Sequence, residues 1–158
     1  MERSSARLAA VQALFQIELT GRDPAEVIAE FDHHRLGAEV DGTRLATVER
    51  RWFADVVAGS WARCAELDPL IAATLAAGWT LERLGPLLRA IFRAAAYELV
   101  CHDEVPPRVI VSEYVDVAQA FHGAAELAFV NAALDKLGRR LRPLEMVGGS
   151  GGEPAAAG

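Results

Sequence analysis

The stretch RLAAVQALFQ at residues 7–16 decides the fold, together with FVNAALDKL at residues 129–137 near the other end of the chain. In both stretches apolar residues recur every three or four positions, which is the spacing of one face of an α-helix. No segment of the chain sustains the alternation of apolar and polar residues that is typical of a strand. The sequence therefore predicts an all-α fold of about seven helices.

The first helix is expected to begin at Ser4 or Ser5, because a serine side chain can accept a hydrogen bond from the exposed amides of the first turn. It is expected to end at Gly21, since glycine readily adopts the left-handed conformation that closes a helix. The predicted buried stripe of this helix consists of Leu8, Val11, Phe15 and Leu19.

Proline and glycine mark the expected boundaries of the other helices. Asp23-Pro24 and Asp68-Pro69 each combine a side-chain cap with a proline suited to the first helical position, so both pairs predict helix starts. Another helix is expected over about 47–64, after a loop at 36–47 that follows a helix end at Gly37. The remaining expected helices follow the stripe from Leu84 to Leu99, begin after Pro106-Pro107 and bury Phe121, and begin after Gly123.

The 158-residue chain is long enough to form one domain with its own core, so neither a cofactor nor a disulfide is required to explain its folding. No apolar run approaches the roughly 20 residues of a membrane-spanning helix, and we expect a cytoplasmic protein. Cys64 and Cys101 match no metal or redox spacing and are expected to be packed thiols. Residues 147–158 are rich in Gly and Ala and are expected to form a disordered tail.

The remaining polar residues suggest neither an enzyme nor a metal site. His33 and His34 would point in different directions on a helix, and no second ligand cluster has a recognisable spacing. Glu98 and His102 share a helical face and could bind a cation, but a Glu capped by its neighbours is the favoured interpretation. No phosphate-binding glycine loop or nucleophile elbow is present in the sequence.

The net charge of −6 argues against a uniformly basic nucleic-acid binder, so any RNA site must be local. Arg3 and Arg7 share a face at the start of the first helix, where the exposed amides also favour phosphate. Phe129 lies beside the apolar stripe of its helix and is the candidate for base stacking. A second basic cluster, which would also complement the end of the last helix, contains Lys136, Arg139, Arg140 and Arg142.

Between the two stretches quoted above lie RAAAYEL at residues 93–99 and then the pair Val105-Pro106. This arrangement resembles the NusB family of transcription antitermination factors over about residues 3–142. The resemblance implies one domain at 1–146 with two packed helical bundles, about 1–64 and 67–146. It also implies a heterodimer with NusE, a protein of the small ribosomal subunit. In the family this heterodimer binds the single-stranded boxA element of nascent ribosomal RNA and acts in the RNA polymerase antitermination complex.

The resemblance also implies roles for individual residues. The positions that imply RNA contacts are Arg3, Arg7, Phe129, Asn131 and Lys136. The positions that imply contacts with NusE are Phe15, Arg89 and Asp135. The chain departs from the family pattern at several of these surfaces, with Ser4 and Ser5 at often basic positions, Phe15 for Tyr, Ala132 for Gly, Ser112 for Asn and Gln119 for Lys. The change at Ser4 and Ser5 predicts weaker RNA binding or a greater dependence on NusE. Phe15 loses a hydroxyl hydrogen bond on the NusE side, and Ser112 and Gln119 remove a polar anchor and a positive charge from the second bundle.

Alternatives to an RNA-binding heterodimer stay open at this level. One is a helical protein-interaction module without RNA binding, and another is a stand-alone relative of the amino-terminal domain of ribosomal RNA cytosine methyltransferases. A homodimer through the NusE face is a further alternative. One exposed basic face formed by Arg3, Arg7 and Lys136 would favour RNA binding, whereas arginines paired with Glu and Asp would favour the interaction module.

Overall fold

The computed structural model describes residues 2–33 and 43–146, which form helices joined by turns and short connections, without a strand. The helices are α1 (Glu2–Thr20), α2 (Pro24–Phe31), α3 (Thr43–Ala62), α4 (Cys64–Ala72), α5 (Leu81–Leu84), α6 (Pro86–Cys101), α7 (Pro107–Gln119) and α8 (Ala124–Leu141). The predicted all-α fold is confirmed. Gly37, part of the loop expected at 36–47, and the tail expected at 147–158 lie outside the described residues.

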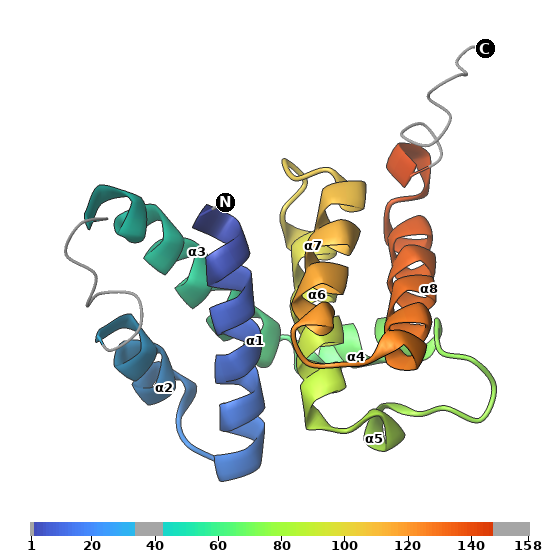
Figure 1. Ribbon diagram of the computed structural model, residues 1–158, viewed down its shortest axis with the longest axis horizontal. Helices are drawn as coiled ribbons and strands as arrows, with labels where there is room; N and C mark the ends of the chain where they lie inside the picture. The colour runs from blue at the N-terminus through green and yellow to red at the C-terminus, as the bar shows by residue number, and fades with distance from the viewer. Residues whose placement is uncertain (1, 34–42, 147–158) are drawn as a thin grey trace.

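The helices form two packed groups that meet along α1, α3 and α6 (Figure 1). α1 packs against α2 and α3 in one group, and α6 packs against α4, α7 and α8 in the other. α1 and α3 also pack directly against α6. The start of α1, the end of α6, the start of α7 and the end of α8 all lie at the same end of the molecule (Figure 1). Residues far apart in the sequence therefore meet at that end.

Small residues allow α6 to approach its neighbours closely. Ala94, Ala95 and Ala96 are fully buried in the middle of this helix, directly before a buried Tyr97 and a fully buried Glu98. On α3, position 59 is a glycine, and a Cβ at that position would collide with the Tyr97 ring. α6 thus lies at the centre of the fold and carries a carboxylate into its core.

α1 differs from the predicted helix in its start and in its buried face. It begins at Glu2 instead of at Ser4 or Ser5. Of the predicted stripe Val11 is buried, Leu8 and Phe15 are half-buried, and Leu19 is 59% exposed, so the predicted stripe is wrong at Leu19 and only partly buried elsewhere. The reason is that α3, α6 and α7 cover α1 on several sides and bury a broad face of mostly small residues. The buried apolar residues of α1 are Ala6, Ala9, Ala10, Val11, Ala13, Leu14 and Ile17.

The predicted helix start at Asp68-Pro69 is wrong. α4 begins at Cys64, and Pro69 lies inside it. Instead of capping a helix, the Asp68 carboxylate accepts hydrogen bonds of 2.9 and 2.8 Å from Arg93 on α6. Leu67 and Ile71, on either side of Pro69, are fully buried. Their packing outweighs the backbone hydrogen bond that a proline cannot donate.

The single helix predicted along the stripe from Leu84 to Leu99 is divided into α5 and α6. Gly85 has a φ of +86°, a conformation that favours glycine, and Pro86 is the first residue of α6. α3 covers Thr43–Ala62, so it begins four residues before the predicted start at 47 and ends two residues before the predicted end at 64. Phe121 is 39% exposed, contrary to its expected burial, because α7 ends at Gln119.

The other local boundary signals are confirmed. Asp23 caps α2 by accepting a hydrogen bond of 3.3 Å from the Ala25 amide, and Pro24 begins that helix. Gly21, with a φ of +71°, follows α1, and Pro107 begins α7. No helix within residues 2–33 and 43–146 is long and apolar enough to cross a membrane. Both cysteines of the chain are free thiols and half-buried.

Candidate functional site

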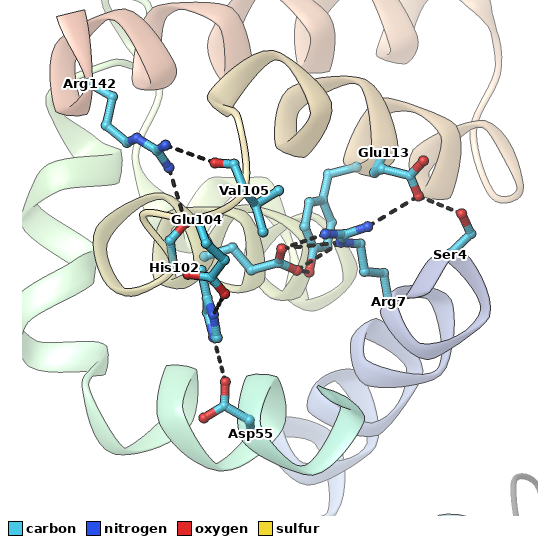
Figure 2. A network of polar contacts seen from close by, with 10 residues as sticks. Ser4, Arg7, Asp55, His102, Glu104, Val105, Glu113 and Arg142 are labelled. Carbon is cyan, nitrogen blue, oxygen red and sulfur yellow. Dashed lines mark hydrogen bonds and ion pairs between the residues drawn. The ribbon is translucent and has the colours of Figure 1, made fainter. Parts of the chain in front are cut away.

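A buried polar network connects the two groups of helices (Figure 2). Glu98 on α6 accepts hydrogen bonds from Arg7 on α1, from Nε at 2.9 Å and from Nη2 at 2.8 Å. The hydroxyl of Tyr114 on α7 donates to the same carboxylate at 2.5 Å. Burial raises the pKa of Tyr114 well above its usual value, so the phenol keeps the proton that it donates. One carboxylate therefore joins three helices.

This network contradicts the predicted contact between Arg7 and an RNA phosphate. The Arg7 side chain is 3% exposed, and its Nη1 lies 3.4 Å from Glu113, which also accepts a hydrogen bond of 2.7 Å from Ser4 (Figure 2). Because two carboxylates occupy the guanidinium, its N–H groups are not available to a phosphate. Arg7 instead holds α1 against α6 and α7.

Arg3, by contrast, is exposed at the start of α1 and is free to meet a phosphate. Its Cζ lies 4.1 Å from the centre of the Trp52 ring on α3, and the His102 ring lies 4.4 Å from the same ring. His102 in turn pairs with Asp55 at 2.6 Å and with Glu104 at 2.8 Å (Figure 2). Burial lowers the pKa of His102, but the hydrogen bonds to Glu104 and Asp55 outweigh that effect and raise it.

Arg142, which the sequence placed in an exposed basic cluster, is 7% exposed. Its guanidinium donates to backbone carbonyls of the connection between α6 and α7 and thereby fixes that connection to the end of α8 (Figure 2). The accepting carbonyls and their distances are those of His102 at 3.3 Å, Asp103 at 3.1 Å and Val105 at 2.8 Å. Glu145 accepts two further hydrogen bonds, of 2.7 and 2.8 Å. Arg142 is therefore a structural residue.

Phe129 and Lys136 lie together, as the resemblance implied for two RNA contacts. Both line a hollow of about 80 Å³ between α8 and the segment that follows α4. Phe129 is half-buried and Lys136 is exposed, without an ion pair within the described residues. The other lining residues are Thr74, Ala76, Ala132 and Ala133.

Trp79 and Arg83 extend this surface and were missed by the sequence analysis. The Trp79 ring is 43% exposed and its centre lies 5.4 Å from that of Phe129. The Arg83 guanidinium lies 5.3 Å from the centre of the Trp79 ring. The signal that could have indicated them is a large aromatic residue directly after Gly78, in a segment of turns where burial is not expected.

Asn131 and Asp135 lie on a different flank of α8 from Phe129. Both line a groove of about 270 Å³ between α7 and α8. The Asp135 carboxylate accepts a hydrogen bond of 2.8 Å from Arg139, so it pairs within its own helix. The remaining lining residues are Arg108, Val111, Ser112, Val115, Asp116 and Met146. The structure thus divides the residues of the FVNAALDKL stretch between two surfaces.

Phe15 and Arg89, two expected contacts with NusE, both lie near the end of α1, Phe15 as part of that helix and Arg89 as a residue of α6 that pairs with Glu18. Phe15 lines a mainly apolar hollow of about 340 Å³ together with Leu19, Phe31 and Phe121. The polar residues Gln12, Gln16 and Thr20 also line it. Arg89 is mostly buried and donates to the Glu18 carboxylate and to the carbonyls of residues 81 and 82. The exposed side chains of Leu19 and Phe121 therefore form an apolar surface next to Phe15. Asp135 lies elsewhere, on α8.

No group of three or more potential metal ligands occurs within residues 2–33 and 43–146. His33 is described, whereas His34 lies outside the described residues. The cluster of Glu98 and His102 that could have bound a cation is taken up by Arg7, Tyr114 and Asp55. The favoured interpretation of Glu98, a carboxylate capped by its sequence neighbours, is also wrong, because its partners come from other helices.

Known proteins are similar to this chain in sequence and in fold. The NusB family model matches residues 4–139. Transcription antitermination protein NusB of Nitrobacter hamburgensis is 51% identical over 140 residues, which cover 89% of this chain and 88% of that protein. The protein of the same name from Sphingopyxis alaskensis is 47% identical over 140 residues, covering 89% and 94%. The solved structure of T. maritima NusB (P3121, form 2) matches with a TM-score of 0.72 at 28% identity, covering 92% of this chain and 96% of that one. The chain therefore belongs to the NusB family.

Proposed function

We propose that this protein binds the single-stranded boxA element of nascent ribosomal RNA as a heterodimer with NusE, within the RNA polymerase antitermination complex. Membership of a family of transcription antitermination factors, which are not enzymes, supports this role. The observation that carries the RNA part of the proposal is the surface formed by Phe129, Trp79, Arg83 and Lys136. It combines partly exposed aromatic rings with cations, the composition by which proteins bind single-stranded nucleic acid.

The mechanism is binding without chemistry. Unpaired bases stack on Phe129 and Trp79, while Lys136 and Arg83 neutralise neighbouring phosphates. Arg3 supplies a phosphate contact at the start of α1, at the opposite end of the molecule from the start of α8 (Figure 1). A strand that meets both sites must cross the molecule, which makes a contribution from a partner protein along the way reasonable.

NusE would use the apolar surface around Phe15. Leu19 and Phe121 are exposed there although both have large apolar side chains, and such patches mark protein interaction sites. Asn131 and Asp135 line a separate groove, and Arg89 acts by fixing Glu18 on α1. We therefore propose that Phe15 contacts NusE directly, whereas Arg89 supports that surface by holding Glu18 of α1 in place.

One alternative has an observation in its favour. Arg7, Arg93 and Arg142 are each held by carboxylates, as expected of an interaction module without RNA binding. The alternative of a methyltransferase relative is not favoured, because relatives named as antitermination proteins match over 88–94% of their own length. The single basic face of Arg3, Arg7 and Lys136 that would favour RNA binding is not formed, because Arg7 is buried, so the RNA-binding proposal is supported instead by the aromatic and cationic surface at Phe129.

The test is a titration of labelled boxA RNA and a scrambled control with this protein, alone and with NusE, at several salt concentrations. We expect selective binding that tightens with NusE. Phe129→Leu keeps an apolar side chain but removes the ring, and should weaken binding about 5- to 150-fold. Lys136→Ala should lower the salt slope by about 0.7.

The matched control is Arg51→Ala, which removes an exposed cation from α3, away from the α8 surface. It should leave affinity and slope close to those of the parent protein. If NusE binds but boxA and scrambled RNA bind equally weakly, the interaction module is the correct reading. If Phe129→Leu binds as tightly as the parent, bases do not stack at that surface.

A further inference from the structure

We propose that Trp52 is a positioning residue for Arg3, holding its guanidinium on the face of the indole so that the outer edge is presented to an RNA phosphate. The inference rests on the proposed RNA binding and assigns a role to residues of α3 and of the connection between α6 and α7. None of these residues belongs to the expected RNA contacts.

The geometry at Arg3 permits stacking and phosphate binding at the same time. The Arg3 Cζ lies 4.1 Å from the centre of the Trp52 ring, and tryptophan is the aromatic residue that attracts cations most strongly. Stacking uses the flat face of the guanidinium, whereas a phosphate is bound by N–H groups along its edge. Within the described residues Arg3 forms no ion pair, and the nearby Glu104 carboxylate is paired with His102 at 2.8 Å.

Trp52 is itself held in place from the core side. Its side chain is 8% exposed, and its buried Nε1 has no hydrogen-bond partner within the described residues. The ring is therefore oriented by what lies against it, namely His102 at 4.4 Å and the Arg7 guanidinium at 5.5 Å. Arg7 is fixed in turn by Glu98. The buried arginine of α1 thus supports the ring on which the exposed arginine of the same helix rests.

His102 connects this support to the second group of helices (Figure 2). It pairs with Asp55 on α3 and with Glu104 on the connection after α6. The pKa of Glu104 is lowered mainly by its hydrogen bond to His102 and further by the charge of Arg3. Because His102 takes up the Glu104 carboxylate, that carboxylate competes less with RNA for Arg3.

A freely rotating arginine at a helix start loses side-chain entropy when it binds a phosphate. Stacking on a fixed ring removes part of that loss beforehand, which is the benefit of preorganisation. Among the side chains that the structure describes at this helix start, Arg3 is the one exposed cation, since Ser4 and Ser5 follow it and Arg7 is buried. Fixing that one cation is therefore a way to keep a phosphate contact with few basic residues.

The experiment measures boxA binding at several salt concentrations, with NusE present, for Arg3→Ala, Arg3→Lys, Trp52→Leu, Trp52→Phe and the double variant Arg3→Ala/Trp52→Leu. Arg3→Ala and Trp52→Leu should each weaken binding about 2- to 5-fold, and the double variant should be no weaker than Arg3→Ala alone. Trp52→Phe keeps an aromatic face and should retain most of the affinity. Arg3→Lys keeps the charge but not the planar stack, so affinity should fall while the salt slope stays near that of the parent.

The results that would overturn the positioning role of Trp52 differ from those that would overturn the proposed binding of boxA RNA. If Arg3→Ala changes neither affinity nor slope, Arg3 does not contact RNA and the positioning role falls with it, whereas boxA binding by Phe129 can still stand. If Arg3→Ala weakens binding but the losses of the single variants add, Trp52 acts only through the fold and the inference is overturned. Arg3→Lys decides the matter should Trp52→Leu fail to fold, because Arg3 is exposed. Parent-like affinity of Arg3→Lys would show that stacking is irrelevant.

Discussion

Arg7 and Glu98, 91 residues apart in the sequence, form a paired ion contact in the core, with side chains 3% and 0% exposed. Two guanidinium nitrogens of Arg7 meet the two carboxylate oxygens of Glu98 at 2.9 and 2.8 Å. The pair joins α1 to α6 and thus the two groups of helices. A buried charge pair adds little net stability over apolar residues of the same volume, but losing one partner is costly. The contact therefore specifies how the groups fit together.

Glu98→Gln should lower the free energy of unfolding by about 3–5 kcal/mol, because the buried Arg7 charge then loses its closest counter-ion and keeps only the more distant, partly exposed Glu113 carboxylate. Urea denaturation of the parent and the variant measures this difference. The double variant Arg7→Met/Glu98→Leu is the control, since it removes both charges and keeps apolar volume. We expect it to be more stable than Glu98→Gln, and the opposite order would contradict the role given to the pair.

Gly59→Ala should destabilise the protein by about 1–3 kcal/mol, although alanine is the better helix former. The new Cβ would collide with the Tyr97 ring, which cannot easily move because it is nearly buried and its hydroxyl donates to Asp55 at 2.8 Å. Thermal unfolding provides the measurement. Gly59→Ala combined with Tyr97→Leu should recover part of the loss, and no recovery would place the strain elsewhere.

Arg142→Ala should cost about 1–3 kcal/mol of unfolding free energy, because the carbonyls of the connection between α6 and α7 lose a charged donor. Arg140→Ala, an exposed position two residues earlier, is the matched control and should stay within about 0.5 kcal/mol of the parent. Hydrogen exchange at residues 102–105 should accelerate only in Arg142→Ala. Equal effects of the two variants would argue against the clamp.

The pH dependence of the unfolding free energy should show how much the protonated form of His102 stabilises the fold. Because the fold raises the pKa of His102, protonated His102 contributes stability that is fully present below its ordinary value of 6.5. That contribution is lost as the pH rises through the higher pKa of the folded state. The difference in unfolding free energy between the parent and His102→Gln should therefore shrink as the pH rises above 6.5. A difference that stays constant with pH would show that the bridge to Asp55 and Glu104 does not depend on the charge.

Local signals predicted several helix boundaries correctly, and failed where packing outweighed them. Asp23-Pro24 begins α2, because a side-chain cap and a fixed φ act within a few residues. Asp68-Pro69 has the same pattern but lies inside α4, since Asp68 pairs with Arg93 on α6 instead of with its own backbone. The two pairs are alike in sequence, and what distinguishes them is the burial of Leu67 and Ile71 around Pro69 together with the pairing of Asp68 with Arg93.

The candidate site was predicted in part for the same reason. Phe129 and Lys136 are seven residues apart on α8, so helical spacing alone places them on one side, and both line the same hollow. Trp79 comes to that surface from a different part of the chain, which periodicity within one helix cannot indicate. The proposed RNA contacts of Arg3, Phe129, Asn131 and Lys136, and those of Phe15 and Asp135 with NusE, stay predictions until they are measured.

The sequence by itself determined that the chain is all-helical, several of the helix boundaries, and which family it resembles. These properties depend on residues within about one helical turn of one another, or on the order of short stretches. Only the tertiary structure decided which arginines are free. Arg3 and Arg7, one turn apart, look equivalent in the sequence, and so do Arg140 and Arg142, two residues apart. Arg7, however, meets Glu98, and Arg142 meets carbonyls 37 to 40 residues away. A charge is available to a ligand only when no partner in the fold has already taken it, and such partners come from distant parts of the chain.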